Sequence, residues 1–309
     1  MTERETTRAQ VVAAVTGAGE DAAVRYAAAE AERLGAPLLV VHVLPLTLPV
    51  GPMVLFPEDS FQAHGADVLA AARSTALEAA PGLEVRTDLR AGGRVHELVA
   101  AAERAALLVV GRRASHSLDR VWTGGTLTGV VARAACPVTV VPTDWAVGPQ
   151  PARVVAGFKS PQHAPELLAV AFARAEQLGA ELVVLHAWQL PGAYDALAAA
   201  EVPDATFNRE QKDAVWRAVS ETAESLPTVP VRVQVVHAPP AEALAEASRA
   251  ASLLVLVRPA HGGLVHHLGR TARTVLREAR CPVEIVVPTP AADAPVPPLV
   301  LEREGHLVR

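Results

Sequence analysis

The sequence predicts two tandem α/β domains of one kind, each built on a parallel β-sheet that helices cover on both faces. Three observations support this prediction. The chain has 309 residues, which suggests two domains at about 100–200 residues per domain. Segments of the first half recur in the second half at a nearly constant offset. Within each half, short apolar runs alternate with Ala-rich stretches, which is the order of βα units.

The internal repeat is the best-defined signal in the chain. Glu32–Val43 and Glu176–Ala187 are identical at 7 of 12 positions, with an offset of 144 residues. The tripeptide Cys-Pro-Val occurs at Cys136 and again at Cys281, with an offset of 145. Two unrelated motifs do not stay in register over such a distance by chance. A duplicated domain of roughly 145 residues is therefore predicted.

The strands are predicted from apolar runs such as Leu-Leu-Val-Val, which do not alternate in polarity. Such runs are typical of parallel strands that are buried on both faces. The predicted strands of the first repeat are Val11–Val15, Leu38–Val43, Leu83–Asp88, Leu107–Val110 and Val138–Val141. Those of the second repeat are Val154–Phe158, Leu182–His186, Val231–Val236, Leu253–Val257 and Val283–Val287.

Helices are predicted between these strands, and the domain boundaries follow from what remains. The helical stretches are Asp21–Leu34, Gln62–Ala79, Val95–Arg104, Leu127–Ala134 and Ala241–Arg249. A segment with Gly148, Pro149 and Pro151 reads as a linker. We therefore place the first domain at 1–144, the second at 152–290, and a proline-rich tail at 291–309.

Composition argues against several classes of protein. The net charge is −5, and no Lys/Arg cluster of the kind that binds nucleic acid is present in the sequence. Two cysteines are too few for a disulfide framework, which favours a reducing, cytoplasmic compartment. The uncharged stretch Ala36–Phe56 is long enough to span a membrane, but its prolines favour a buried strand followed by an apolar loop. We expect neither nucleic acid nor membrane as a partner.

Several features together resemble the universal stress protein family, in both halves of the chain. They are a first strand that enters a short turn, a Leu-Gly-Ala…Val-His strand, a Leu-Leu-Val-Val strand followed by a glycine loop, and a Cys-Pro-Val last strand. The resemblance implies five-stranded doubly wound domains with strand order 3-2-1-4-5. It also implies that the two halves pair through their fifth strands about a pseudo-two-fold axis, and that the protein is a regulatory stress-response module and not an enzyme.

The resemblance also implies where a nucleotide would bind. Doubly wound sheets bind ligands at the carboxyl ends of the two strands where the order reverses. ATP-binding members of the family place there an Asp after strand 1, backbone of the Val-His-Val strand, and a phosphate loop of the form Gly-x2-Gly-x9-Gly-(Ser/Thr). The residues of the first repeat that match these positions are Thr16, Gly17, Val43, Gly111, Arg112, Ala114, Gly124, Gly125 and Thr126.

The match in the first repeat is incomplete. Thr16 stands at the Asp position, Ala114 replaces the second glycine, and Gly125 stands at the Ser/Thr position, although the loop spacing is intact. Because glycines at such loops let backbone N–H groups approach a phosphate, and because the last glycine would open a helix, a weakened ATP or AMP site is one hypothesis. In the second repeat Lys159 stands at the Asp position and Pro259 removes a donor, so no usual nucleotide site is expected there.

Other candidates have ordinary structural readings. His42 and His186 are expected to shape the strand ends. Cys136 and Cys281 are expected to be buried and structural. The histidines of the second-repeat loop are expected to be exposed and not bound to a metal. Arg112 and Arg113 either contact a phosphate or are solvated. The apolar loop Pro45–Pro57 suggests an interface or a lid. The apolar residues of this loop and its two end prolines are Pro45, Leu46, Leu48, Val50, Met53, Val54, Leu55, Phe56 and Pro57.

Two functional hypotheses follow. In the first, the first repeat binds ATP or AMP and the second is structural. In the second, the chain is a nucleotide-independent protein-interaction module that acts as an intramolecular dimer. Its partner would be a second copy of the chain, which gives a homodimer, or an unidentified protein. An enzyme acting on adenylated substrates is a third class, which no Ser/His/Asp or Cys/His pattern supports.

Overall fold

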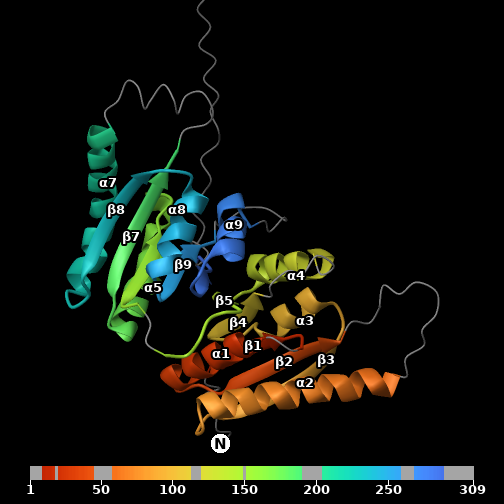
Figure 1. The fold of residues 1–309 in the computed structure, drawn as a ribbon. Helices are drawn as coiled ribbons and strands as arrows, with labels where there is room; N and C mark the ends of the chain where they lie inside the picture. The colour runs from red at the N-terminus through yellow and green to blue at the C-terminus, as the bar shows by residue number, and fades with distance from the viewer. Residues whose placement is uncertain are drawn as a thin grey trace, which may run out of the picture.

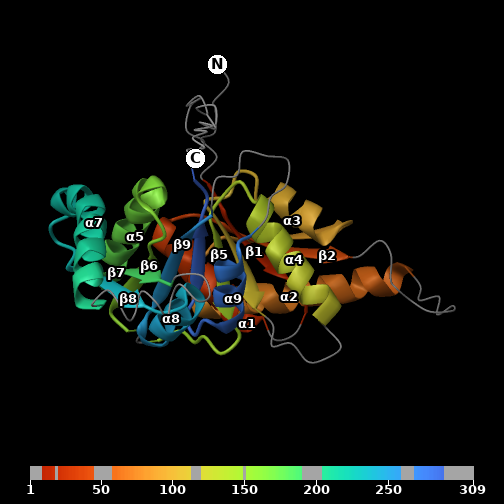
Figure 2. The same cartoon turned by 90° about the horizontal axis from the view of Figure 1, so that it is seen from above.

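In the computed structural model, the two repeats form one continuous ten-stranded sheet in the order β3-β2-β1-β4-β5-β10-β9-β6-β7-β8. Figures 1 and 2 show the repeats side by side, the first coloured red to yellow and the second green to blue. The structure describes residues 9–17, 20–44, 58–112, 120–148, 151–189, 204–258 and 268–288.

The first repeat alternates strands and helices as predicted. Its strands are β1 (Val11–Val15), β2 (Leu38–Leu44), β3 (Val85–Ala91), β4 (Leu107–Arg112) and β5 (Val138–Pro142). Its helices are α1 (Asp21–Leu34), α2 (Glu58–Ala79), α3 (Arg94–Ala101) and α4 (Arg120–Arg133). Within this repeat all paired strands are parallel, and the order 3-2-1-4-5 is confirmed.

The second repeat has the same topology. Its strands are β6 (Arg153–Gly157), β7 (Glu181–Trp188), β8 (Val231–His237), β9 (Leu253–Val257) and β10 (Val283–Val286). Its helices are α5 (Ala164–Leu178), α7 (Asp204–Ser225), α8 (Pro240–Ala247) and α9 (Arg270–Glu278), with short 3₁₀ turns at Pro161–His163 and Ser248–Ala250. Read outward from the junction, the order is again that of the first repeat.

The two repeats join through β5 and β10, which is the one antiparallel pair among the described strands. The register places Glu284 opposite Thr139 and Ile285 opposite Val138. Because each repeat contributes its fifth strand, the junction relates the repeats by a pseudo-two-fold axis. The predicted pairing through the fifth strands is therefore confirmed.

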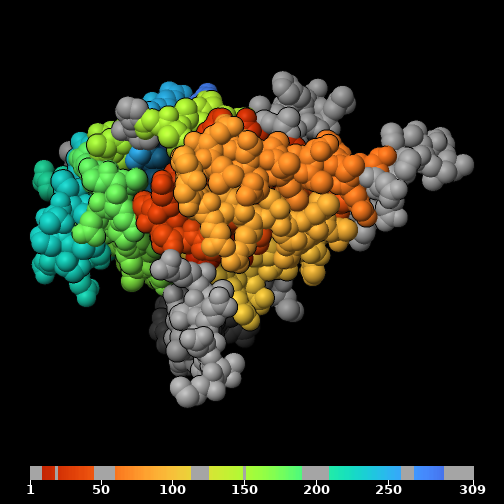
Figure 3. All heavy atoms as spheres, turned by 90° about the horizontal axis from the view of Figure 1, so that it is seen from below, coloured from red at the N-terminus to blue at the C-terminus, as the bar shows by residue number. Residues whose placement is uncertain are grey.

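The two faces of the sheet are packed differently. On one face, buried side chains under α3, α4, α8 and α9 form a single hydrophobic cluster that continues across the junction. On the other face, one cluster lies under α1 and α2 and a separate one under α5 and α7. Figure 3 views the molecule from below, where the red atoms of the first repeat lie against the green atoms of the second. Apolar burial therefore holds the junction together on one face only.

The repeated Leu-Gly-Ala motif is a helix stop. Gly35 ends α1 with φ +58° and Gly179 ends α5 with φ +57°, a left-handed conformation that favours glycine. The next residue of each motif donates its N–H back into the helix, Ala36 to Ala31 at 2.9 Å and Ala180 to Ala175 at 2.9 Å. The motif thus recurs because both helices must turn sharply into a central strand.

Several element boundaries differ from the prediction, three of them in ways that have a physical reason. The predicted strand Leu83–Asp88 is observed at Val85–Ala91, because β3 is an edge strand whose pairing with β2 continues from Leu89 to Ala91, where apolar and charged residues mix. The predicted helix Val95–Arg104 ends earlier, at Ala101, and the predicted helix Leu127–Ala134 begins earlier, at Arg120. Glycine is a poor helix former, so Gly124-Gly125 hid the first turns of α4.

None of the helices in the described ranges combines the length and the apolar composition that crossing a membrane requires.

Candidate functional site

The crevice that the family resemblance implies lies at the carboxyl ends of β1 and β4. These strands are parallel neighbours, with Ala14 paired to Val110. The helix after β1 packs in the cluster under α1 and α2, whereas the helix after β4 packs on the opposite face. Strand order therefore reverses here, and Thr16, Gly17, Gly111 and Arg112 come together at this edge of the sheet.

A carboxylate that the sequence reasoning missed occupies the crevice. Oε2 of Glu20 accepts the backbone N–H groups of Thr16 and of Gly17, the latter at 3.3 Å. Thr16 Oγ1 donates to Oε1 of the same carboxylate at 2.9 Å. Glu20 is only 6% exposed. The two backbone donors at the end of β1, which an anion would use, therefore bind a side chain of the chain itself.

Gly111 is needed because of this arrangement. A Cβ atom there would lie 3.3 Å from Cγ of Glu20 and 3.4 Å from Cβ of Ala23. The absence of a side chain lets Glu20 lie against the end of β4. The first glycine of the predicted phosphate loop is thus used for close packing of α1.

Arg112 does not face the crevice, so its predicted role as a phosphate contact is not supported by the geometry. Its Nη1 donates to the carbonyl oxygen of Ala279 at 2.7 Å and more weakly to that of Leu276 at 3.5 Å. Both carbonyls lie at the C-terminal end of α9 in the second repeat. Unpaired carbonyls at a helix end carry partial negative charge, which a guanidinium stabilises.

The second repeat makes the equivalent contact to a helix end of the first repeat. Arg258, directly after β9, is the counterpart of Arg112 at the end of β4. Its Nη1 donates to the carbonyls of Val131, Ala132 and Ala134 at 3.0, 2.9 and 3.0 Å. These carbonyls close the C-terminal end of α4. Each repeat therefore caps a helix of the other across the junction, and both arginines are used for this purpose.

The remaining predicted residues of the first repeat lie on separate elements where they are described, and positions 113–119 of the predicted loop lie outside the described residues. Gly124 and Gly125 lie inside α4, which begins at Arg120, so the predicted opening of a helix at these glycines is wrong. Thr126 follows them in the same helix and is half-buried, and Val43 lies within β2 with its side chain buried. Ala114 lies outside the described residues.

His42 and His186 play the structural role that their repetition predicts. Nδ1 of His42 donates to the carbonyl of Val15 at 2.9 Å, and Nδ1 of His186 donates to that of Phe158 at 3.1 Å. Each histidine thus ties the second strand of its repeat to the last residues of the first. Burial lowers the pKa of His42 below its ordinary value.

The second repeat has different residues toward the carboxyl ends of its strands. A Cβ atom on Gly157 would lie 2.4 Å from Cδ2 of Leu256, so this leucine packs against the end of β6. Lys159 is exposed, and Trp188 stacks on His237 with ring centroids 4.1 Å apart. The predicted loop around Pro259, with the histidines that follow it, lies outside the described residues.

The cysteines and the apolar loop have separate outcomes. Both cysteines are buried and unpaired, and burial raises the pKa of Cys136 to about 11 and that of Cys281 to about 12, so the structural reading is supported. No group of three or more metal-binding side chains occurs among the described residues. The loop Pro45–Pro57 lies outside the described residues.

A buried ionic cluster marks the junction on the face where the apolar core is interrupted. Arg174 of α5 donates to Glu30 of α1 at 2.6 Å and to Glu284 of β10 at 2.8 Å. All three side chains are at least nine-tenths buried. Aligning the repeats places Glu30 and Arg174 at the same position, 144 residues apart. Opposite charges at equivalent positions were the signal in the sequence that could have indicated this ion pair.

Comparison with known proteins agrees with this architecture. The model of the universal stress protein family matches residues 8–142 and again 152–287. A universal stress protein of Mycobacterium tuberculosis is 32% identical over 286 residues, covering 88% of this chain and 95% of the relative.

A solved structure shows the same fold. A universal stress protein from Archaeoglobus fulgidus matches with a TM-score of 0.65 and 20% identity, covering 90% of this chain and 96% of that one. Another from the same organism, solved in complex with dAMP, covers 44% of this chain at 23% identity and a TM-score of 0.34. With two family matches that span most of its length, the chain belongs to the universal stress protein family.

Proposed function

We propose that this protein works in the stress response as a nucleotide-independent interaction module, in which one chain forms its own dimer. Its two halves are the domains at 1–144 and 152–290. We expect it to act in the cytoplasm as a binding protein and not as an enzyme. The partner would be another protein, or a second copy of the chain.

The observation that carries this proposal is the Glu20 carboxylate in the crevice of the first repeat. It already accepts the N–H groups of Thr16 and Gly17. A nucleotide phosphate is an anion, and a buried carboxylate beside it would repel it in a poorly solvated site. One predicted counter-charge, Arg112, is bound to carbonyls of the second repeat instead.

The alternative is a weakened ATP or AMP site in the first repeat, which the intact loop spacing from Gly111 to Gly124 favours. Such a ligand would require Glu20 to leave the end of β1. It would also bind without a contact from Arg112, unless this arginine lost its hydrogen bond to the carbonyl at the end of α9. These two costs make the interaction module the better-supported proposal.

The test is whether the purified chain carries or binds nucleotide. The protein is denatured and any released nucleotide is identified, and the melting temperature is then measured with and without ATP–Mg²⁺. A ligand present at 100 times its dissociation constant stabilises the native state by about 2.7 kcal/mol, which a melting curve resolves. We expect no released nucleotide and no shift at millimolar ATP.

A bound nucleotide, or a shift that Gly124→Val removes and the matched variant Gly269→Val leaves intact, would overturn the proposal in favour of the first-repeat site. Release of ADP over time would instead indicate an enzyme.

A further inference from the structure

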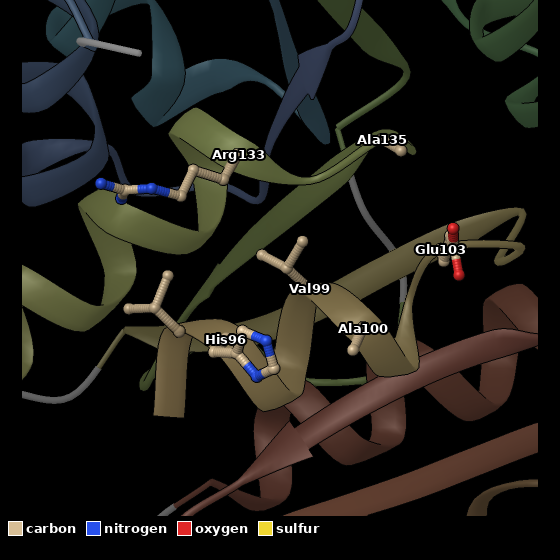
Figure 4. Close-up of a pocket in the computed structure, with 7 residues that line it drawn as sticks. His96, Val99, Ala100, Glu103, Arg133 and Ala135 are labelled. Carbon is tan, nitrogen blue, oxygen red and sulfur yellow. The ribbon is translucent and has the colours of Figure 1, made fainter. Parts of the chain in front are cut away.

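An open groove lies between α3 and the C-terminal end of α4 in the first repeat (Figure 4). Its volume is about 710 Å³. The groove has apolar walls and a charged rim. The wall residues are Val95, Val99, Ala100 and Ala135, and the rim residues are His96, Glu103 and Arg133.

The apolar walls are not a requirement of the fold. Aligning α3 with α8, the equivalent helix of the second repeat, places Val99 at the position of Ala245 and Ala100 at that of Glu246. Ala100 and Glu246 are both exposed. The same helix thus tolerates a small and a charged residue where the first repeat has apolar ones, so the groove needs an explanation outside core packing.

The chain leaves the sheet beside this groove. In the antiparallel register Ile285 lies opposite Val138, so the C-terminal end of β10 lies beside the start of β5, three residues after the wall residue Ala135. Contacts agree with this placement. Arg258 donates its backbone N–H to Val286 at 2.9 Å, and its guanidinium contacts the carbonyl of Ala134 at 3.0 Å.

We propose that the groove binds the C-terminal tail of the same chain, through the segment Leu299–Glu304. Residues 289–309 lie outside the described residues, and their sequence suits the groove. Leu299, Val300 and Leu301 match the apolar walls, and the alternating charges Glu302, Arg303 and Glu304 match a rim that carries both signs. The first eight residues are polar and charged, without such an apolar run, so the tail is the better occupant.

The connection is long enough. Leu299 is eleven positions after Pro288, a connection that spans up to about 36 Å when extended, whereas the eight residues of α3 are about 12 Å long. Because the segment is tethered beside its site, its effective concentration is in the millimolar range, and a weak contact suffices. The tail would then cover a surface that a protein partner could otherwise reach. This inference does not depend on whether nucleotide binds the crevice.

The test uses the full chain with one spin label. Both native cysteines are buried, so the variant Gly305→Cys can be labelled selectively with a nitroxide, which broadens nearby amide signals in NMR spectra. We expect loss of amide peak intensity for residues of α3 that line the groove. The double variant Val99→Ala, Ala100→Glu gives α3 the residues of α8 and should restore those peaks.

A matched control changes the second repeat in the opposite sense. Ala245→Val with Glu246→Ala gives α8 the residues of α3, and should leave the broadening of α3 unchanged. Unbroadened α3 peaks in the labelled chain, or broadening that survives the α3 double variant, would overturn the proposal. So would broadening that appears only when labelled and isotope-enriched molecules are mixed, because the occupant would then be a second copy.

Discussion

Nη1 of Arg174 lies 2.6 Å from Oε2 of Glu30, and the two residues occupy the same position in the two repeats. Residues near a two-fold axis meet their own equivalents. In a dimer of identical domains Glu30 would therefore meet a second glutamate. Duplication within one chain allowed the two positions to diverge into a complementary pair.

Two further pairs at the junction follow the same rule. Arg33 of α1 donates to Gln177 of α5, its equivalent 144 residues later. Thr139 lies opposite Glu284 in the β5–β10 ladder, at the offset that relates the two Cys-Pro-Val motifs. Unlike residues at all three positions favour pairing of the first repeat with the second over pairing of either repeat with itself.

Replacing the central arginine tests this cluster. Arg174→Met leaves Glu30 and Glu284 buried without their counter-charge, and removal of one partner from a buried ion pair costs about 3–5 kcal/mol. The free energy of unfolding, measured with urea, should fall by that order. Adding Glu30→Gln and Glu284→Gln should recover most of the loss, because the uncompensated charges are then gone. A single variant as stable as the unmodified protein would contradict this account.

The reciprocal helix caps predict unequal effects of two similar variants. Arg258 contacts three carbonyls at 2.9–3.0 Å, whereas Arg112 has one close contact at 2.7 Å. Hydrogen bonds to charged groups contribute about 1.5–3 kcal/mol, so Arg258→Gln should destabilise more than Arg112→Gln. Urea unfolding curves of the two variants decide the order. Equal losses would mean that the number of carbonyls capped is unimportant.

The sequence predicted the scaffold well because its signals are local or repeated. Runs such as Leu38–Val43 mark strands buried on both faces. The Leu-Gly-Ala motif and the Cys-Pro-Val motif recur at the same points of the fold, since each is tied to a helix stop or to the strand at the junction.

The crevice was predicted less well, because the spacing of residues in a loop does not determine the direction of their side chains. Arg112 stands at a phosphate-loop position, yet it points to the C-terminal end of α9, where its contact Ala279 lies 167 residues further along the chain. Glu20 was passed over because it precedes α1 and matches no motif. Its role depends on the approach of β4 at Gly111, which only the folded chain brings about.

The histidine in β2 predicts a pH dependence of stability. Burial lowers the pKa of His42, while the unfolded chain has a value of about 6.5. The unfolded state therefore binds the proton more readily, so this contribution to stability is complete above pH ~6.5 and is lost as the pH falls through the lower folded value. His42→Gln should flatten the dependence of the unfolding free energy on pH below pH ~6.5.

The two thiols are predicted to be unreactive in the native protein. With pKa values of about 11 for Cys136 and about 12 for Cys281, both remain protonated at neutral pH, and the thiolate is the reactive form. A colorimetric thiol reagent should modify neither cysteine in buffer and both in denaturant. Fast modification of the folded chain would show that one of them is accessible, and would reopen a redox role.

Glu20 predicts a difference between two adjacent carboxylates. Glu20→Ala removes an acceptor from the partly buried N–H groups of Thr16 and Gly17 and from the Thr16 hydroxyl, and loss of a partner for a donor costs up to about 1–3 kcal/mol when the donor is buried. Asp21 is next to it at the start of α1 but is exposed, so Asp21→Asn should stay within about 0.5 kcal/mol of the unmodified protein. Thermal unfolding of both variants measures the difference. Similar small losses would mean that water replaces the carboxylate at the end of β1, and that Glu20 neither orders this turn nor keeps anions out of it.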